Sequence, residues 1–84
     1  MTYSLQILRR TQKELAQLPT NAYEQTCDAI RDLSYDPRPR NCRKLTGREG
    51  WRIRVGHYRV IYEINDRRQV VTVVHVGHRR DVYR

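Results

Sequence analysis

Residues 51–61 read WRIRVGHYRVI, and the architecture expected of the chain follows from this stretch. Apolar and basic side chains alternate in its first half, a period of two that is typical of a strand with one buried face. Gly56-His57 then predicts a two-residue turn, which would place Arg54 opposite Arg59 on a second strand. Like charges that face each other on paired strands cost a few tenths of a kcal/mol to about 1 kcal/mol. Arg52, Arg54 and Arg59 therefore predict an electropositive sheet face that needs a polyanion as its partner.

The positive charge of the chain is concentrated in its second part. The chain has 84 residues and a net charge of +8. Residues 1–37 carry four basic and five acidic side chains, whereas residues 38–84 carry thirteen basic and four acidic ones. A chain of this length has room for one small core, so we expect a single domain over residues 1–84. A one-sided basic surface is typical of proteins that bind nucleic acid or an acidic protein.

The composition also narrows the class of partner and the compartment. Fifteen of the 17 basic residues are arginine, which favours bidentate contacts to phosphate. No stretch approaches the ~18–20 apolar residues of a membrane span and no signal-like segment opens the chain, so we expect no membrane partner. Cys27 and Cys42 have neither the spacing of a zinc site nor that of a disulfide framework. We therefore expect a protein of the reducing cytoplasm.

The first part of the chain predicts one strand and two helices. Alternation over residues 3–8 indicates the strand. Thr11 and Glu14 fit a capping box, so a short helix is expected to begin there and to end at Pro19. Thr20 can cap a second helix with one apolar stripe. The members of this stripe are Tyr23, Cys27, Ile30 and Leu33.

The second part predicts a sheet. Residues 38–50 read as a loop, and residues 65–68 as a turn into a valine-rich strand over residues 69–76. The order is then β-α-α-β-β-β. The simplest arrangement is an α+β fold in which a helical hairpin packs on one face of an antiparallel sheet and the other, basic face stays open. The tyrosines Tyr58 and Tyr62 share the parity of the core residues, and His57 in the turn is expected to have no functional role.

Four segments of the chain follow one another in a characteristic order and spacing. They are KLTG at residues 44–47, WRIRV at 51–55, YRVIY at 58–62 and VGHRRDVY at 76–83. Together they resemble the toxins of the RelE/ParE superfamily, the small basic partners in bacterial toxin–antitoxin pairs. The likeness is closer to the RelE-like ribonucleases than to the ParE branch, which poisons DNA gyrase.

The resemblance implies an enzyme, its partners and its site. The enzyme would be an endoribonuclease that cuts messenger RNA in the A site of the ribosome, by attack of a ribose 2′-OH on the adjacent phosphate and without metal or cofactor. Its partner would be a cognate antitoxin, in a hetero-oligomeric complex that binds operator DNA through the antitoxin. The residues that the resemblance places in the RNA site are Arg52, Arg54, Arg59, Arg79 and Tyr83.

The resemblance leaves the proton transfers open. Well-studied members carry lysines where this chain has Arg52 and Arg54, and a guanidinium is a poor general base. The 2′-OH would then be activated by alignment and electrostatics, or by another group. The alternative groups are His75, His78 and Glu63, with His78 ranked first as a proton donor because it can titrate near neutral pH. Further RNA contacts are expected from Lys44, Arg48 and Arg80.

Two other functions remain as alternatives. A ParE-like protein would inhibit gyrase by protein contacts without catalysis. A plain nucleic-acid-binding module would bind with a steep salt dependence and leave its RNA intact.

Overall fold

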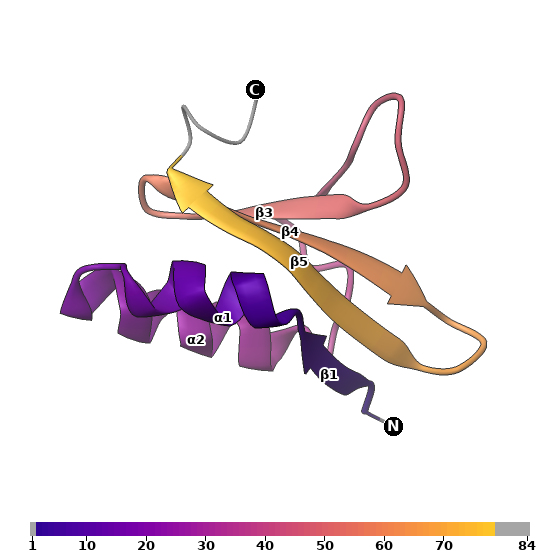
Figure 1. Cartoon of the computed structure of the whole chain (residues 1–84). Helices are drawn as coiled ribbons and strands as arrows, with labels where there is room; N and C mark the ends of the chain where they lie inside the picture. Colours follow the sequence, from indigo (N-terminus) through magenta and orange to yellow (C-terminus); the bar gives the residue numbers. More distant parts are fainter. Residues whose placement is uncertain (1, 79–84) are drawn as a thin grey trace.

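The computed structural model describes residues 2–78 of the chain. Its elements, in chain order, are β1 (Ser4–Ile7), α1 (Arg9–Ala16), α2 (Thr20–Asp32), β2 (Arg43–Lys44), β3 (Trp51–Val55), β4 (Tyr58–Asn65) and β5 (Val70–His78). The five strands form one sheet in the order β1-β5-β4-β3-β2. Both helices lie on the same side of the sheet (Figure 1). The expected α+β fold with a helical hairpin on one sheet face is therefore confirmed.

The β3–β4 hairpin has the predicted register. Val55 pairs with Tyr58 and Arg54 with Arg59, so the turn contains two residues. Gly56 has a φ of +59°, which is the requirement of the first central position in a type II′ turn. The short turn fixes which residues share a sheet face, because it leaves no freedom for the second strand to slip.

The sheet is mixed, which corrects the expectation of an antiparallel one. The pairs β2–β3, β3–β4 and β4–β5 are antiparallel, but β1 pairs with β5 in parallel, with Ser4 opposite Val70. Alternation in a sequence indicates which face of a strand is buried but says nothing about the direction of its neighbour. Because β5 has a partner on each side, it is a central strand, as its runs of valine predicted.

The first helix begins earlier than the capping box predicted. Helix α1 starts at Arg9 after Leu8, and no side chain caps it. Thr11 lies within the helix and is 0% exposed. The carboxylate of Glu14 contacts β5 instead of the helix start. The capping-box prediction was therefore wrong, because a tertiary contact recruited the glutamate that the local motif would have used.

The core lies between the helices and the sheet. Its buried members are Leu15, Ile30, Leu33, Ile53, Val60, Tyr62, Val71, Val73 and Val76. The Tyr62 hydroxyl donates a hydrogen bond of 2.7 Å to the Pro37 carbonyl oxygen, and burial raises the pKa of Tyr62. Tyr23 is 43% exposed, so the predicted stripe on α2 is wrong at that position.

Candidate functional site

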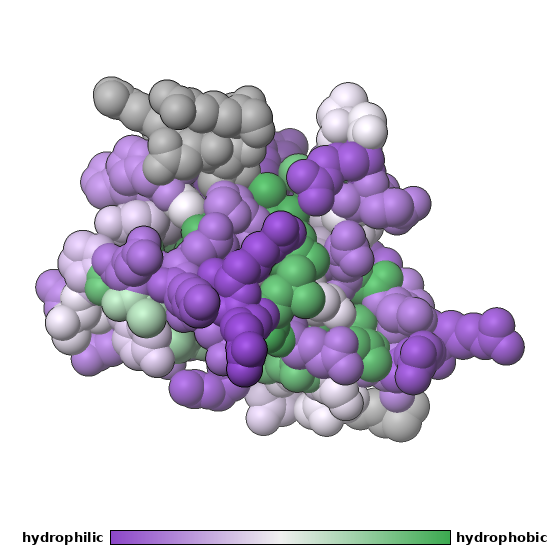
Figure 2. Space-filling view, viewed as in Figure 1, coloured by the Kyte–Doolittle hydropathy of each residue, from purple (hydrophilic) through white to green (hydrophobic). Residues whose placement is uncertain are grey.

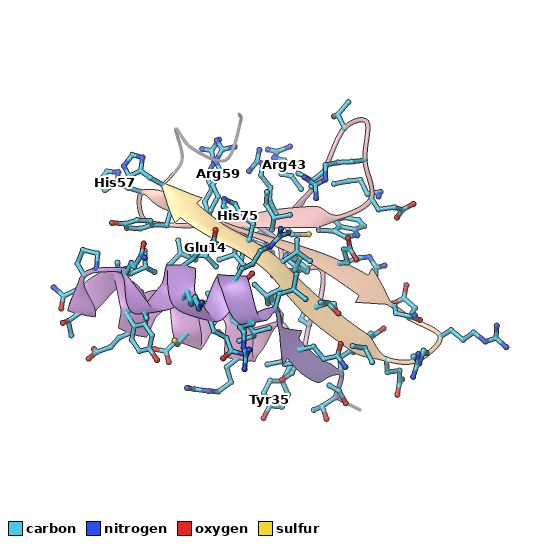
Figure 3. The ribbon with its side chains drawn as sticks, in the orientation of Figure 1. Glu14, Tyr35, Arg43, His57, Arg59 and His75 are labelled. Atoms are coloured by element: carbon cyan, nitrogen blue, oxygen red, sulfur yellow. The ribbon has the colours of Figure 1, made fainter. Side chains whose placement is uncertain are left out.

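Among residues 2–78, four arginines share the sheet face that the helices leave uncovered. In the register of the sheet, Arg43 lies opposite Arg52, and Arg54 lies opposite Arg59. We call this set of four residues the arginine face. Figure 3 shows Arg43 and Arg59 pointing to the side of the sheet away from the helices. The predicted convergence of Arg52, Arg54 and Arg59 on one face is borne out by this register.

Arg59 does not have the exposure that the sequence suggested. It is 1% exposed, whereas Arg54 opposite it is exposed to solvent. Arg59 lies on β4, between Arg54 on β3 and Gly77 on β5. Arg59 therefore has a paired residue on each side of it in the sheet. The expectation of three solvent-facing arginines is corrected to two, with a third beneath the surface.

Arg43 is a member of the face that the sequence did not reveal. It belongs to β2, which has two residues and lies inside the stretch that read as a loop. Two residues are too few to show a period, so no pattern in the sequence distinguished Arg43 from the other basic residues of the loop. The pairing of Arg43 with Arg52 is what identifies Arg43 as a member of the face, and this pairing is known only from the structure.

Lys44 faces the other side of the sheet. It pairs with Trp51, and its Nζ lies 5.5 Å from the centroid of the Trp51 ring. The Arg38 guanidinium lies 5.0 Å from the same ring. Both cations are placed for cation–π contacts. The structure therefore does not bring Lys44, expected as an RNA contact, to the arginine face. Arg48 is exposed in the loop that joins β2 to β3.

A polar cluster holds the loop that precedes β2. Arg38 donates two hydrogen bonds to the Asp66 carboxylate, at 2.8 and 3.2 Å, and the Tyr3 hydroxyl donates a third at 2.6 Å. These bonds, first from Arg38 and then from Tyr3, lower the pKa of Asp66 to about 2. The cluster links the start of the chain, the loop and the β4–β5 turn. It therefore holds in place the loop that leads into β2, the strand that carries Arg43.

The two candidate histidines lie on opposite faces. His78 pairs with Tyr58, which has core parity, and its ring makes an edge contact with Tyr58 at 5.7 Å and stacks on His57 at 6.3 Å between centroids. This placement separates His78 from the arginine face. His75 instead lies opposite Ile61, which itself lies opposite Arg52. The first-ranked histidine of the sequence analysis is thus the one that the structure keeps apart from the arginines.

His75 has a carboxylate partner on the first helix. Its Nδ1 lies 2.8 Å from Oε2 of Glu14, and the backbone N–H of Val76 donates to Oε1 of the same carboxylate at 3.0 Å. Figure 3 shows the two residues close together, Glu14 on the side of α1 and His75 at β5. The side chains are 31% and 33% exposed. Nothing in the sequence connects these residues, because 60 positions separate them.

A hollow of about 470 Å³ lies at the end of the sheet away from the β3–β4 turn. Its lining includes Gln6, Glu49, Trp51, Glu63, Asp66 and Thr72. Glu63, the third alternative for proton transfer, belongs to this hollow. No member of the arginine face is among the described residues that line it. The hollow and the arginine face are therefore separate parts of the molecule.

Three residues of the predicted site lie outside the described residues. They are Arg79, Arg80 and Tyr83.

Within residues 2–78, no helix has the length and apolar character needed to cross a membrane. The surface in the view of Figure 2 is mainly hydrophilic, with a narrower hydrophobic band near its middle.

Comparisons with known proteins agree on one family. The family described as the ParE toxin of the type II toxin–antitoxin system parDE matches residues 4–83. Toxin RelG of Mycobacterium tuberculosis is 32% identical over 89 residues, covering 100% of this chain and 99% of that protein. The archaeal RelE–RelB complex of Pyrococcus horikoshii OT3 contains a chain with 33% identity and a TM-score of 0.84, covering 94% of this chain and 97% of that one.

A third relative is the intact RelBE toxin–antitoxin complex of E. coli. Its matching chain has 31% identity and a TM-score of 0.77, over 90% of this chain and 95% of that one. Two solved relatives are thus complexes of a toxin with its antitoxin, which supports a cognate antitoxin as the partner of this chain. Because the family match spans nearly the whole sequence and the relatives exceed 30% identity, the resemblance is confirmed: this chain belongs to the RelE/ParE superfamily and is the toxin of a RelBE-type toxin–antitoxin system.

Proposed function

We propose that this toxin is a ribosome-dependent endoribonuclease that cuts messenger RNA in the ribosomal A site and so inhibits translation. The observation that carries the proposal is the arginine face, in which four guanidinium groups from three neighbouring strands share one side of the sheet. Like charges on paired strands repel one another, and this repulsion destabilises the sheet unless an anion binds to them. The phosphate backbone of RNA supplies such an anion along its whole length.

The arrangement suits the charge that builds up during RNA cleavage. When a 2′-OH attacks the adjacent phosphate, negative charge grows on the phosphate oxygens, and positive groups already in place stabilise it without reorganising. Arg43 and Arg54 are exposed and Arg52 is partly exposed, so these residues can contact the RNA directly. Arg59, buried on the same face, supplies a fixed positive charge from beneath, where screening by water is weaker.

Arg79 and Tyr83 complete the proposed site. The resemblance to RelE-like toxins implies that Arg79 contacts the phosphate and that Tyr83 stacks on a base or orients the 2′-OH. Arg80 is proposed as a further RNA contact. The reaction would leave a 2′,3′-cyclic phosphate on one product and a free 5′-OH on the other.

The cognate antitoxin would control this activity. We propose that it binds the toxin in a hetero-oligomeric complex in the cytoplasm and that its own DNA-binding part brings the complex to operator DNA. The names of the solved RelE–RelB and RelBE complexes support the first part of this proposal. A toxin that cuts messenger RNA needs such a partner in order to be produced without stopping translation.

A ParE-like inhibitor of DNA gyrase is the second candidate. It is favoured by the family match, whose description names the ParE toxin. The solved relatives with 31–33% identity are RelE toxins, which favours the ribonuclease.

Cleavage mapping separates these candidates. A defined messenger RNA is incubated with the toxin, freed of antitoxin, in the presence and absence of programmed ribosomes, and the ends of the products are mapped. Cuts in the A-site codon that require ribosomes and leave 5′-OH ends are expected. RNA that stays intact in both reactions, together with loss of gyrase supercoiling activity on addition of the toxin, would establish the second candidate instead.

A further inference from the structure

The contact between Glu14 and His75 has the geometry of a carboxylate–imidazole dyad. Both carboxylate oxygens of Glu14 are engaged, one by the Val76 N–H at 3.0 Å and the other by His75 Nδ1 at 2.8 Å. A carboxylate that is held at two points cannot rotate freely, so it fixes the plane of the imidazole ring that it contacts. A purely local ion pair would need only one of these contacts.

The dyad selects one tautomer of the histidine. An ionised carboxylate can only accept hydrogen bonds, so Nδ1 of His75 carries the proton that Glu14 accepts. The lone pair of the neutral ring then resides on Nε2. Because the His75 side chain is 33% exposed, the ring is accessible from solvent. A positioned nitrogen with a lone pair and access to solvent is what a general base requires.

A register shift in the sheet places His75 on the sheet face that carries the arginines. Tyr62 pairs with Val73, but its neighbour Ile61 pairs with His75, so one extra residue of β5 is accommodated between them. Without that residue, His75 would lie opposite Val60, on the core side. Bulges of this kind re-aim side chains and are common next to active sites.

The shift brings His75 beside the buried arginine. Arg59 pairs with Gly77, so His75, two residues away on β5, is its diagonal neighbour on the same face. Diagonal neighbours in an antiparallel pair lie about 7–8 Å apart, within reach of long and aromatic side chains. His75 therefore borders on Arg59, the buried member of the arginine face.

We propose that His75 is the general base of the cleavage reaction and that Glu14 is its positioning residue. The inference rests on the proposed function and deepens it, because arginine at positions 52 and 54 cannot readily take a proton. Nε2 of His75 removes the proton from the 2′-OH, the O2′–P bond forms, and the P–O5′ bond breaks. The departing O5′ takes a proton from water, and the products are a 2′,3′-cyclic phosphate and a 5′-OH.

Among the described charged residues, Glu14 on α1 contacts His75, and Arg59 on β4 is its diagonal neighbour. Ile61 lies between His75 and Arg52 in the register, and Arg43 lies beyond Arg52. Arginine keeps its charge at all physiological pH values, whereas histidine ordinarily titrates between about pH 5 and pH 8. A histidine base works only when its ring is neutral. The cleavage rate is therefore expected to rise with pH through this range and then to level off.

The test is single-turnover cleavage on programmed ribosomes between about pH 5 and pH 8. The wild-type toxin is compared with His75→Ala, Glu14→Gln and the control His57→Ala, which removes an exposed histidine at the β3–β4 turn. We expect His75→Ala to lower the rate at neutral pH by about 100-fold or more and to abolish the rise with pH. Glu14→Gln is expected to lower the rate by at least about tenfold, because the ring loses its anchor, and His57→Ala to match the wild type.

The outcomes distinguish the inference from the proposed function. A wild-type toxin that does not cut on ribosomes would overturn the proposed function itself. A wild-type toxin that cuts, with His75→Ala equal to it in rate and pH profile, would overturn only the role of His75. Thermal melting of each variant provides the remaining control. If His75→Ala loses activity only in proportion to its unfolded fraction and keeps the rise with pH, the dyad is structural and the inference is wrong.

Discussion

Arg54 and Arg59 face each other across β3 and β4, yet solvent reaches only one of them. Arg54 is exposed, and Arg59 is 1% exposed. In the register, Arg59 lies between Arg54 and Gly77, whereas β2 pairs only with Trp51 and Arg52 and leaves Arg54 with a paired residue on one side. Two residues of the same type, adjacent on one face, are therefore expected to contribute in different ways.

Removal of Arg54 should impair cleavage without impairing folding. The Arg54→Ala variant loses one donor to the RNA phosphate, and loss of a preorganised donor commonly costs about 100- to 1,000-fold in rate. The free energy of unfolding should stay within about 0.5 kcal/mol of the wild type, because the side chain is exposed. Single-turnover cleavage and urea denaturation measure the two quantities. Arg67→Ala, in the exposed β4–β5 turn, removes the same charge elsewhere and should retain activity.

Removal of Arg59 should impair both cleavage and the stability of the fold. The Arg59→Ala variant empties a site that is 1% exposed, and we expect the free energy of unfolding to fall by about 1–3 kcal/mol through lost packing. Arg59→Met keeps most of the volume but not the charge, so it should recover part of the stability and none of the cleavage. A methionine variant that cuts like the wild type would show that the buried charge has no part in the reaction.

The hairpin could be predicted from sequence because a two-residue turn determines its register locally. Once Gly56-His57 was recognised as the turn, the pairing of Arg54 with Arg59 followed. The burial of Arg59 could not be predicted in this way, because the turn determines only its partner on β3. The contact of Glu14 with β5 could not be predicted from the sequence either, since the local motif around Thr11 predicted a different partner for the carboxylate.

Arg43 should contribute to RNA binding more than its neighbour Lys44. The two residues are consecutive on β2, but Arg43 belongs to the arginine face and Lys44 lies against Trp51. Each lost phosphate contact lowers the slope of log affinity against log salt by about 0.7 for a single strand. Fluorescence anisotropy with a 2′-deoxy oligonucleotide, which cannot be cut, measures this slope. Arg43→Ala should lower it by about that amount and Lys44→Ala by less; equal effects would contradict the assignment of faces.

The hydroxyl of Tyr62 should stabilise the fold through its bond to Pro37. The hydroxyl donates to the carbonyl oxygen at 2.7 Å in a buried setting. In Tyr62→Phe this oxygen loses its partner, and an unsatisfied buried acceptor costs about 1–3 kcal/mol. Urea denaturation should show a loss of this size. Tyr35→Phe is the matched control, because Tyr35 is 70% exposed and should change the free energy of unfolding by less than about 0.5 kcal/mol.

The histidines illustrate why the candidate site was only partly predictable. A single extra residue in β5 decides whether His75 points to the core or to the arginine face, and no feature of the valine-rich sequence marks that position. The same shift sets the pairing of His78 with Tyr58 and so places it apart from the arginines. Composition and alternation therefore predicted the type of surface, while the identity of the histidine on it depended on tertiary register.

The contacts of Asp66 should make the stability of the toxin sensitive to acid. Arg38 and Tyr3 lower the pKa of Asp66 to about 2, from an ordinary value of 3.8. A group whose pKa is lowered by folding stabilises the folded state above its unfolded pKa, and this contribution is lost as the pH falls through the folded pKa. The stabilisation is therefore expected to be complete at neutral pH and to decline between about pH 4 and pH 2.

Urea denaturation of the wild type and of Asp66→Asn across this range provides the measurement. The wild type should be more stable at neutral pH, and the difference should shrink steadily as the pH approaches 2. Asp28→Asn is the control, because Asp28 makes one exposed ion pair with Arg31, at 3.1 Å, and exposed pairs contribute little. A gap between wild type and Asp66→Asn that stays constant down to the lowest pH would mean that the ionised carboxylate of Asp66 is not what stabilises the folded protein.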